Sequence, residues 1–330
     1  MSKKQHWVGF DLGGTKMLAK IFDNEFNGLG KSRNKTKGYE GSDIGLERIA
    51  KTIDEAIDQA GIKRSSIDGI GIGCPGPLDL EKGIIHNAPN LGWRNVPIQA
   101  HLEKTFDCPV VMLNDVDAGV YGEYQYGAAR ETRTVVGVFP GTGIGGGCVY
   151  DGQIIRGKTA SCMEIGHVQV APEGPLCGCG RRGCLEAVAS RLVIASQAAA
   201  AAYRGQAPHL LAAAGSDLQN IRSGALAASV AAGDTQVENL IREAARHIGR
   251  AVAGVVNIMG PDMVVLGGGL VEAMPELFVG EVSSTAKKRA LPTLANSFDV
   301  VEAKLGDDAS VIGAASWAKH KFGNKNEKKN

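Results

Sequence analysis

The chain has 330 residues, more than a single hydrophobic core usually holds, so we expect two domains or lobes. Its formal net charge is +1, and this balance excludes a global field that would attract nucleic acid or an anionic membrane. It shows neither a signal-peptide segment nor a run approaching about eighteen apolar residues, so we expect a cytoplasmic protein with no nucleic-acid or membrane partner.

The first half of the chain predicts a strand–turn–strand unit followed by alternating helices and strands. The opening strands flank the glycine turn in Asp11-Leu-Gly-Gly-Thr-Lys16, and a loop rich in Pro, Asn and Gly covers 78–96. Apolar runs predict strands, and apolar residues at helical spacing predict helices. The strands are expected at 7–10, 17–22, 67–72 and 109–113, and the helices at 43–60 and 115–126.

The second half starts with the same plan. Strands at 134–139 and 148–155 flank a glycine-rich turn at 141–147, and an alanine-rich helical region covers 190–258. The remaining strands are expected at 264–266 and 298–303, the remaining helices at 274–289 and 309–320, and a disordered tail at 324–330. Two halves that open alike suggest one fold used twice, with a cleft between them.

A cysteine cluster lies between these two regions of the second half. His167, Cys177, Cys179 and Cys184 follow the pattern H-x9-C-x-C-x4-C, and glycines let the backbone bend between the sulfurs. Three thiolates and one imidazole are the ligand set of a closed, structural zinc site. The alternative is ordinary buried cysteines, but chance rarely puts three cysteines into eight glycine-rich residues. The chain has seven cysteines, an odd number, so a disulfide framework is not expected.

Two glycine turns are candidates for binding a phosphate chain, because only glycine removes the side chain that would block close approach to backbone N–H groups. Neither matches the Walker or the dinucleotide pattern, and each alone is more often just a turn. Their equivalent places in the two halves favour the phosphate interpretation, and Asp11 could hold the accompanying magnesium. The turn residues are Gly13, Gly14 and Thr15 in the first half and Gly141, Thr142 and Gly143 in the second.

Asn114 and Asp115 follow a predicted strand, at the carboxyl end where α/β sheets place their ligands. The carboxylate of Asp115 could simply cap the next helix. As a functional group it would be a general base that removes a hydroxyl proton during phosphoryl transfer. Asp117 is the competing carboxylate, and Asp115 is preferred because Asn114 beside it is a natural donor to the same substrate.

With these motifs the chain resembles the ROK family (repressors, open reading frames and sugar kinases) from Trp7 to about Trp317. The family belongs to the actin-like ATPase superfamily, which implies an α/β, two-lobed actin-like ATPase (ribonuclease H-like) fold with a cleft between lobes. The lobes would be 1–116 plus 309–323, and 117–308 with the zinc site. The motifs that carry the resemblance are Asp11–Lys16 and Gly141–Gly147 for phosphates, Gly267–Gly269 for adenosine, Glu164–His167 for sugar, and Cys177–Glu186 for zinc and sugar.

The resemblance implies a role for individual residues. Asp115 matches the catalytic aspartate, and the zinc ligands match His167, Cys177, Cys179 and Cys184. The sugar contacts match Asn90, Asn114, Glu164, His167 and Glu186. The nucleotide and Mg²⁺ contacts match Asp11, Gly13, Gly14, Thr15, Lys16, Gly141, Thr142, Gly143, Gly267, Gly268 and Gly269. The chain departs from the family pattern at Asp117 and at Arg191, which follows Ser190 where a Ser-Gly pair is common. Arg191 could change specificity if it lies near the sugar or the nucleotide; by default we expect a helix residue that faces solvent.

The implied activity is ATP-dependent phosphorylation of a hexose at its 6-hydroxyl, with glucose favoured, by a homodimer that uses ATP, Mg²⁺ and a structural Zn²⁺. One alternative is a kinase for mannose, fructose, N-acetylglucosamine or N-acetylmannosamine. Another is a non-catalytic sugar-sensing repressor, which is disfavoured because only ten residues precede Asp11. The donor, ATP or polyphosphate, stays open.

Overall fold

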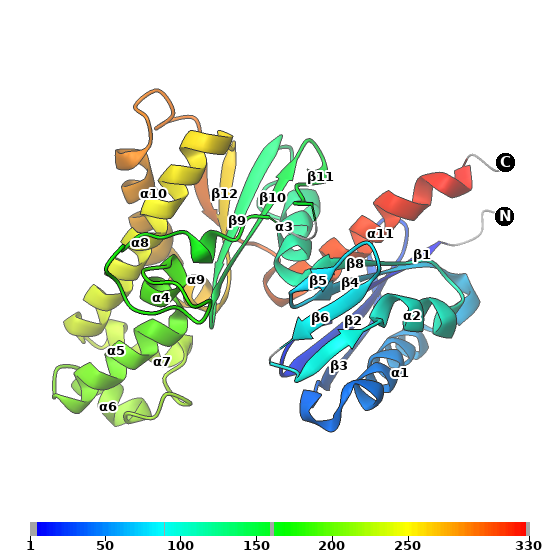
Figure 1. The fold of residues 1–330 in the computed structure, drawn as a ribbon, viewed down its shortest axis with the longest axis horizontal. Coiled ribbons are helices and arrows are strands. Elements are labelled where there is room, and N and C mark those ends of the chain that lie inside the picture. The colour runs from blue at the N-terminus through cyan, green and yellow to red at the C-terminus, as the bar shows by residue number, and fades with distance from the viewer. Residues whose placement is uncertain (1–4, 89, 159–161, 328–330) are drawn as a thin grey trace. The chain divides into compact units, whose positions relative to one another are not determined.

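The computed structural model describes residues 5–88, 90–158 and 162–327, with side chains to residue 323, and divides into two compact units (Figure 1). The first unit comprises Met1–Arg130, Gln153–Cys162 and Asp307–Asn330, and the second comprises Glu131–Gly152 and Met163–Gly306. These boundaries differ from the expected division at 116/117. Segments 117–130 and 153–162 belong to the first unit, since the helix after Asn114 packs along the last helix of the chain.

The first unit is built on a five-stranded sheet with the order β3-β2-β1-β4-β8. β1, β2 and β3 pair antiparallel, whereas β1, β4 and β8 run parallel. The strands are β1 (His6–Leu12), β2 (Lys16–Phe22), β3 (Gly28–Lys35), β4 (Ile67–Cys74) and β8 (Val110–Asn114). The helices are η1 (Gly38–Glu40), α1 (Ser42–Ala60), η2 (Arg64–Ser66), α2 (Ile98–Phe106), α3 (Asp115–Tyr126) and α11 (Ala309–Glu327).

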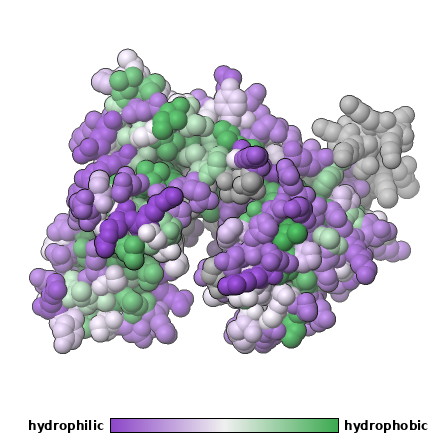
Figure 2. Space-filling model, viewed as in Figure 1, coloured by the Kyte–Doolittle hydropathy of each residue, from purple (hydrophilic) through white to green (hydrophobic). Residues whose placement is uncertain are grey.

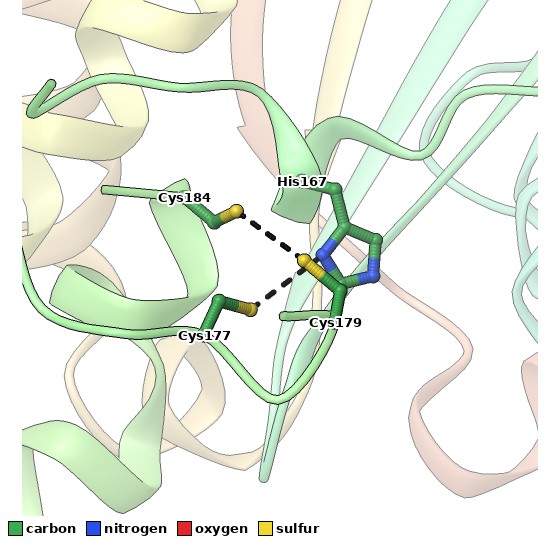
Figure 3. A group of neighbouring side chains, drawn as sticks. All are labelled: His167, Cys177, Cys179 and Cys184. Atoms are coloured by element: carbon green, nitrogen blue, oxygen red, sulfur yellow. Dashed lines mark hydrogen bonds between the residues drawn. The ribbon is translucent and has the colours of Figure 1, made fainter. Parts of the chain in front are cut away.

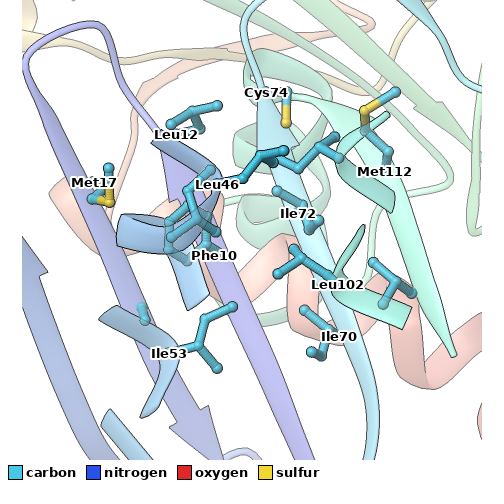
Figure 4. Close-up of a cluster of buried hydrophobic side chains, with 14 of the residues drawn as sticks. Phe10, Leu12, Met17, Leu46, Ile53, Ile70, Ile72, Cys74, Leu102 and Met112 are labelled. Carbon is cyan, nitrogen blue, oxygen red and sulfur yellow. The ribbon is translucent and has the colours of Figure 1, made fainter. Parts of the chain in front are cut away.

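The two faces of this sheet carry different side chains. On one face Phe10, Ile70 and Ile72 pack against apolar residues of α1 and α2 (Figure 4). On the other face the strands carry Gly9 and Gly71, and a Cβ atom at either would lie 1.8 Å from a carbonyl oxygen of α11. Successive strand residues point to opposite faces, so this alternation lets α11 lie directly on the backbone of β1 and β4.

The predicted loop at 78–96 is wrong in part. It contains a small antiparallel sheet of β5 (Leu78–Asp79), β6 (Ile84–Ala88) and β7 (Trp93–Val96). Trp93, at the start of β7, is buried and donates a hydrogen bond from Nε1 to the Gly38 carbonyl oxygen. The apolar residues that stabilise this sheet are few and widely spaced, so the strands left no periodic signal.

The second unit repeats the plan of the first. Its sheet has the order β11-β10-β9-β12-β13, with β9 and β10 antiparallel and β9, β12 and β13 parallel. The strands are β9 (Thr134–Pro140), β10 (Ile144–Tyr150), β11 (Gln153–Ile154), β12 (Met263–Leu266) and β13 (Asp299–Glu302). The helices are η3 (Ile165–His167), α4 (Leu185–Ala189), α5 (Arg191–Tyr203), α6 (Pro208–Ala214), α7 (Ser223–Ala231), α8 (Thr235–Met259), α9 (Gly269–Ala273) and α10 (Pro275–Arg289), with η4 (Gly306–Asp308) at the boundary to the first unit.

By length and mean hydropathy alone, Leu185–Tyr203 could cross a membrane, although it includes Glu186 and Arg191 and is no uninterrupted apolar run. The segment is two helices, α4 and α5, which meet at Ser190, and nearly half of it is buried inside the protein. The visible face of the molecule is mainly hydrophilic, with apolar residues scattered over it (Figure 2).

Helix α11 continues to Glu327 and so includes the first four residues of the segment 324–330 that was expected to be a disordered tail. Residues 328–330 lie outside the described part of the chain.

Candidate active site

The carboxyl ends of β1, β4 and β8 bring the candidate catalytic residues of the first unit to one edge of its sheet. Asp11 of β1 pairs in register with Gly73 of β4, and Cys74 pairs with Asn114 of β8. Burial raises the pKa of the Cys74 thiol, and the nearby carboxylates of Asp115 and Asp11 raise it further. Both carboxylates therefore act on the same buried position, at the sheet edge where parallel strands place ligands.

Asp11 is held by a residue from the far end of the chain. The Ser310 hydroxyl, in the first turn of α11, donates a 2.9 Å hydrogen bond to Oδ1 of Asp11. Burial raises the pKa of Asp11, while the hydrogen bond from Ser310 opposes that rise. A buried carboxylate beside a glycine turn has the hard oxygen donors that Mg²⁺ prefers, so the residues present fit this ion.

Asn114, and not Asp115, caps helix α3. Oδ1 of Asn114 accepts hydrogen bonds from the backbone N–H groups of Val116 at 2.9 Å and Asp117 at 3.2 Å. Asp115 is the first residue of the helix and is half-buried. Helix N-termini favour the ionised form of a carboxyl group. Asn114 is therefore the N-cap, although Oδ1 of Asp115 also accepts a hydrogen bond from the Val116 N–H at 3.0 Å. A carboxylate at this position suits the role of a proton acceptor.

Asp117, the competing carboxylate, is 1% exposed. It interacts electrostatically with Arg156. Burial lowers the pKa of Arg156, and the Asp117 carboxylate offsets only part of that shift. A general base must come within hydrogen-bond reach of the proton it removes. Because Asp117 is enclosed in the protein, Asp115 is the better candidate.

The first glycine turn joins β1 to β2. The Thr36 hydroxyl donates a 2.7 Å hydrogen bond to the Gly13 carbonyl oxygen, and the Thr36 N–H donates to the Thr15 carbonyl oxygen at 3.0 Å. A Cβ atom built at Gly14 would lie 3.3 Å from Cβ of Asn90, so this sugar-site candidate is beside the turn. Gly14, Thr15, Lys16 and Asn90 are exposed.

The second glycine turn joins β9 to β10 and is braced by helix α5. The backbone N–H of Arg191 donates to the Gly141 carbonyl oxygen at 2.9 Å, and Nη2 of Arg191 donates to Oγ1 of Thr142 at 2.8 Å. The expectation that Arg191 simply faces solvent is therefore wrong. Sequence reasoning missed this contact because the two residues are 49 positions apart.

Glu186 links the second glycine turn to the cysteine cluster. Its Oε2 accepts a 3.0 Å hydrogen bond from the Ile144 N–H, and its Oε1 lies 3.8 Å from Sγ of Cys177. A Cβ atom at Gly143 would come within 2.2 Å of Oε2. Glycine at 143 is thus required for Glu186 to lie where it does.

The cysteine cluster can hold a metal ion (Figure 3). One ligand atom from each of His167, Cys177, Cys179 and Cys184 lies within 4.8 Å of the others. Sγ of Cys179 and Sγ of Cys184 are 3.6 Å apart, and Nδ1 of His167 is 3.8 Å from Sγ of Cys177. A tetrahedral zinc ion with Zn–S bonds of about 2.3 Å has sulfurs roughly 3.8 Å apart, so the donor set fits zinc.

The protonation of the cluster is uneven. A hydrogen bond from the backbone of Arg181 lowers the pKa of the Cys179 thiol, although this side chain is exposed. Burial raises the pKa of Cys184 to about 11, with further increases from Cys179 and Cys177. Binding a divalent cation would favour the thiolate form of all three, since the thiolate is the metal ligand.

Glu164 and His167 lie at the short helix η3, close to strand β10. The Glu164 carbonyl oxygen accepts a 2.9 Å hydrogen bond from the His167 N–H, and the Glu164 side chain is exposed. Nδ1 of His167 faces the sulfurs, which leaves Nε2 on the other side of the ring. The second unit thus brings Glu164, His167 and Glu186 around β10, whereas Asn90, Asn114 and Asp115 belong to the first unit.

The predicted adenosine motif follows β12. Gly267 donates from its N–H to the Val138 carbonyl oxygen at 3.2 Å, and Gly268 has a φ of +91°, a conformation that favours glycine. Because β9 and β12 are parallel neighbours, Gly267, Gly268 and Gly269 lie at the same sheet edge as the turn at Gly141.

Comparisons with known proteins identify the family and the fold of the chain. The ROK family model matches residues 7–321. The chain is 34% identical over 317 residues to a glucokinase of Thermotoga maritima, covering 96% of this chain and 98% of the relative. The structure resembles a ROK hexokinase from Thermus thermophilus, with a TM-score of 0.82 and 33% identity over 97% of this chain and 99% of the other.

It also resembles a ROK family glucokinase from Streptomyces griseus solved in complex with glucose and AMPPNP. That match has a TM-score of 0.82 and 29% identity, and it covers 96% of this chain and 99% of the other. The predicted two-lobed α/β fold of the actin-like ATPases is confirmed by these matches.

Proposed function

Because this chain belongs to the ROK family, we propose that it transfers the γ-phosphoryl group of ATP to the 6-hydroxyl of a hexose, with glucose as the favoured substrate. The observation that carries the proposal is the position of Asp115. It begins α3 at the carboxyl ends of three parallel strands, next to Asn114, which is the N-cap of the helix. Full-length similarity to glucokinases, and to a glucokinase structure holding glucose and an ATP analogue, supports the same activity.

In this proposal Asp115 is the general base. Its carboxylate accepts the proton of the attacking hydroxyl as the phosphoryl group is transferred, a role that contributes about 10²–10⁴-fold in rate. The amide of Asn114 uses its Oδ1 for capping, so its contact with the sugar would come from the Nδ2 donors.

The nucleotide would be held by both glycine turns and by Gly267, Gly268 and Gly269. Backbone N–H groups of the turns offer donors to phosphate oxygens. Asp11, oriented by the hydroxyl of Ser310, would hold Mg²⁺ directly or through water. The ion supplies neutralisation of charge on the terminal phosphates.

The sugar would be bound by groups that form hydrogen bonds with several hydroxyls. They are Asn90, Asn114, Glu164, His167 and Glu186. A site of this kind rejects sugars that lack a matching hydroxyl, because buried polar groups would be left unpaired.

Zinc in this proposal is structural. His167, Cys177, Cys179 and Cys184 fill all four positions of a tetrahedral site, which leaves none for a reacting water. The metal would fix His167 directly and, through Cys184 two residues earlier in the chain, the position of Glu186, so that two of the sugar contacts depend on it. Ligand thiols are kept reduced in a cytoplasm, which is the location we propose. The homodimer that the family implies is also a proposal, and light scattering of the purified protein tests it.

The test is an ADP-release assay over a panel of hexoses and amino sugars, run with Mg²⁺·ATP and, in parallel, with polyphosphate as donor. A rate on glucose well above the rates on mannose, fructose, N-acetylglucosamine and N-acetylmannosamine supports the proposal. Similar rates on several hexoses would indicate a broad hexokinase. No rate on any sugar would contradict the kinase and favour a sugar sensor.

A further inference from the structure

Arg191 is a cation attached to the second glycine turn. It is the first residue of α5, and its backbone N–H and its guanidinium group contact adjacent residues of the turn, Gly141 and Thr142. The two hydrogen bonds, at 2.9 and 2.8 Å, hold both ends of the residue to the same few atoms. The two hydrogen bonds therefore hold the guanidinium group in a fixed position relative to the turn.

Within the described part of the chain, no carboxylate forms an ion pair with this cation. The side chain of Arg191 forms a hydrogen bond to Thr142 instead. The carboxylate that borders the same turn, Glu186, is bound at Ile144 on the β10 side. A guanidinium group has five N–H donors in a planar fork, and one bond to a hydroxyl leaves most of them for another acceptor.

The turn itself is the one to which we assign the phosphates. An arginine fork matches phosphate oxygens in geometry and charge, and arginine is favoured wherever phosphate is recognised by paired N–H donors. A neutral sugar hydroxyl would gain much less electrostatic energy from a guanidinium group than a phosphate anion would. The chemistry next to Thr142 therefore suits an anion.

We propose that Arg191 is an additional phosphate-binding residue of this chain, contacting the β- or γ-phosphate of the donor from the Thr142 end of the turn. The proposal rests on the proposed function, and it assigns a role at a position where the family pattern commonly has glycine. Arg191 would bind the donor and not the sugar, and its contribution would depend on the terminal phosphates.

The experiment measures dissociation constants by titration calorimetry for AMP, ADP and AMPPNP with Mg²⁺, and separately for glucose. Arg191→Ala is expected to raise the dissociation constants of ADP and AMPPNP by about 10- to 100-fold, the range for losing hydrogen bonds to a charged group. AMP and glucose are expected to bind as they do to the unchanged protein. Arg204→Ala, which removes an exposed arginine at the other end of α5, is the matched control and should change none of the four constants.

Arg191→Gln separates phosphate binding from bracing of the turn. The glutamine amide can donate to Thr142 but carries no charge, so this variant should keep its melting temperature and still lose affinity for ADP and AMPPNP. Unchanged affinity for both nucleotides in the Ala and Gln variants would overturn the proposal. Equal weakening of AMP would also overturn it, because a disrupted turn would affect every nucleotide.

The outcome is distinguishable from failure of the proposed function. If the unchanged protein binds ADP and AMPPNP but phosphorylates no hexose, the kinase proposal fails while the comparison of Arg191 variants still stands. If the unchanged protein phosphorylates glucose and the variants bind nucleotides normally, the inference about Arg191 alone is wrong.

Discussion

Gly143→Ala should weaken sugar binding indirectly, by displacing the side chain of Glu186. The new Cβ atom would lie 2.2 Å from Oε2 and 3.1 Å from Cδ of Glu186, closer than nonbonded atoms approach, so the carboxylate must withdraw. Gly143 has no positive φ, so alanine itself is tolerated by the backbone and the collision is the main perturbation. The 3.0 Å hydrogen bond from Ile144 to Glu186 should be lost.

The size of the effect follows from that bond. A hydrogen bond to a charged acceptor contributes about 1.5–3 kcal/mol, and the half-buried position of Glu186 favours the lower end. A loss of about 1.5 kcal/mol would lower the melting temperature of this unit by roughly 3–6 °C. If the displaced carboxylate also loses its sugar contact, the dissociation constant for glucose should rise about 10-fold or more.

The assay is calorimetric titration of glucose without nucleotide, together with thermal melting. Gly178→Ala is the control, because a Cβ atom at this glycine of the cysteine cluster would meet nothing within 4 Å. Glu186→Ala and the double variant Gly143→Ala/Glu186→Ala complete a double-mutant cycle. Since both changes remove the same contact, that of the Glu186 carboxylate with the sugar, their effects on glucose binding should not add. If Gly143→Ala weakens glucose binding by the same factor when Glu186 is absent, the collision is not the cause and the reasoning fails.

Three further predictions concern the base, the metal and a buried carboxylate. Asp115→Asn should lower kcat by about 10²–10⁴-fold while calorimetric glucose affinity is kept; normal turnover would remove Asp115 from the role. Cys179→Ser should abolish stoichiometric zinc, measured by elemental analysis, and lower the melting temperature; full activity in a demonstrably metal-free protein would contradict a structural metal. Asp234→Ala should lower the free energy of unfolding by about 2–4 kcal/mol at pH 7. The Leu210 N–H and the Ser229 hydroxyl, which donate to Oδ2 of Asp234 at 2.8 and 2.7 Å, would be left as buried donors without this acceptor. Burial raises the pKa of Asp234, but the hydrogen bonds of Ser229 and Leu210 outweigh it and the pKa is lowered. The stabilisation is therefore present above the pKa of an unfolded aspartate, about 3.9, and disappears as pH falls through the folded pKa. Melting curves that show the same difference from the unchanged protein at pH 7 and pH 2 would contradict this.

Side-chain clusters and turns could be predicted from the sequence where the contacting residues are close together in the chain. Cys177, Cys179 and Cys184 span eight residues, and the structure brings them together with His167. The glycine turns are likewise visible, because each joins two consecutive strands. The second was predicted too long: residues 144–147, expected in the turn, are the first part of β10, because glycines in a strand carry no apolar signal. The assignment of Asp115 used its place after an apolar run, the neighbouring Asn114 and the match to the catalytic aspartate of the family.

Other relationships depend on residues that meet only after folding. Ser310 reaches Asp11 across 299 positions, and Arg191 reaches Thr142 across 49. Nothing in the neighbouring sequence marks either serine or arginine as a partner. The division of the chain also shifted, since α3 joins the first unit by packing against α11.

The amino-acid sequence by itself predicted the strand–turn–strand plan, a candidate metal-ligand set and a candidate base, because periodicity, short-range spacing and motif resemblance can be read without the fold. Only the tertiary structure decided that Asn114 caps α3, that Asp117 is enclosed near Arg156, and that Arg191 is attached to a glycine turn. Which side chain satisfies which polar group depends on the packing of whole elements, and a single sequence does not state how those elements meet.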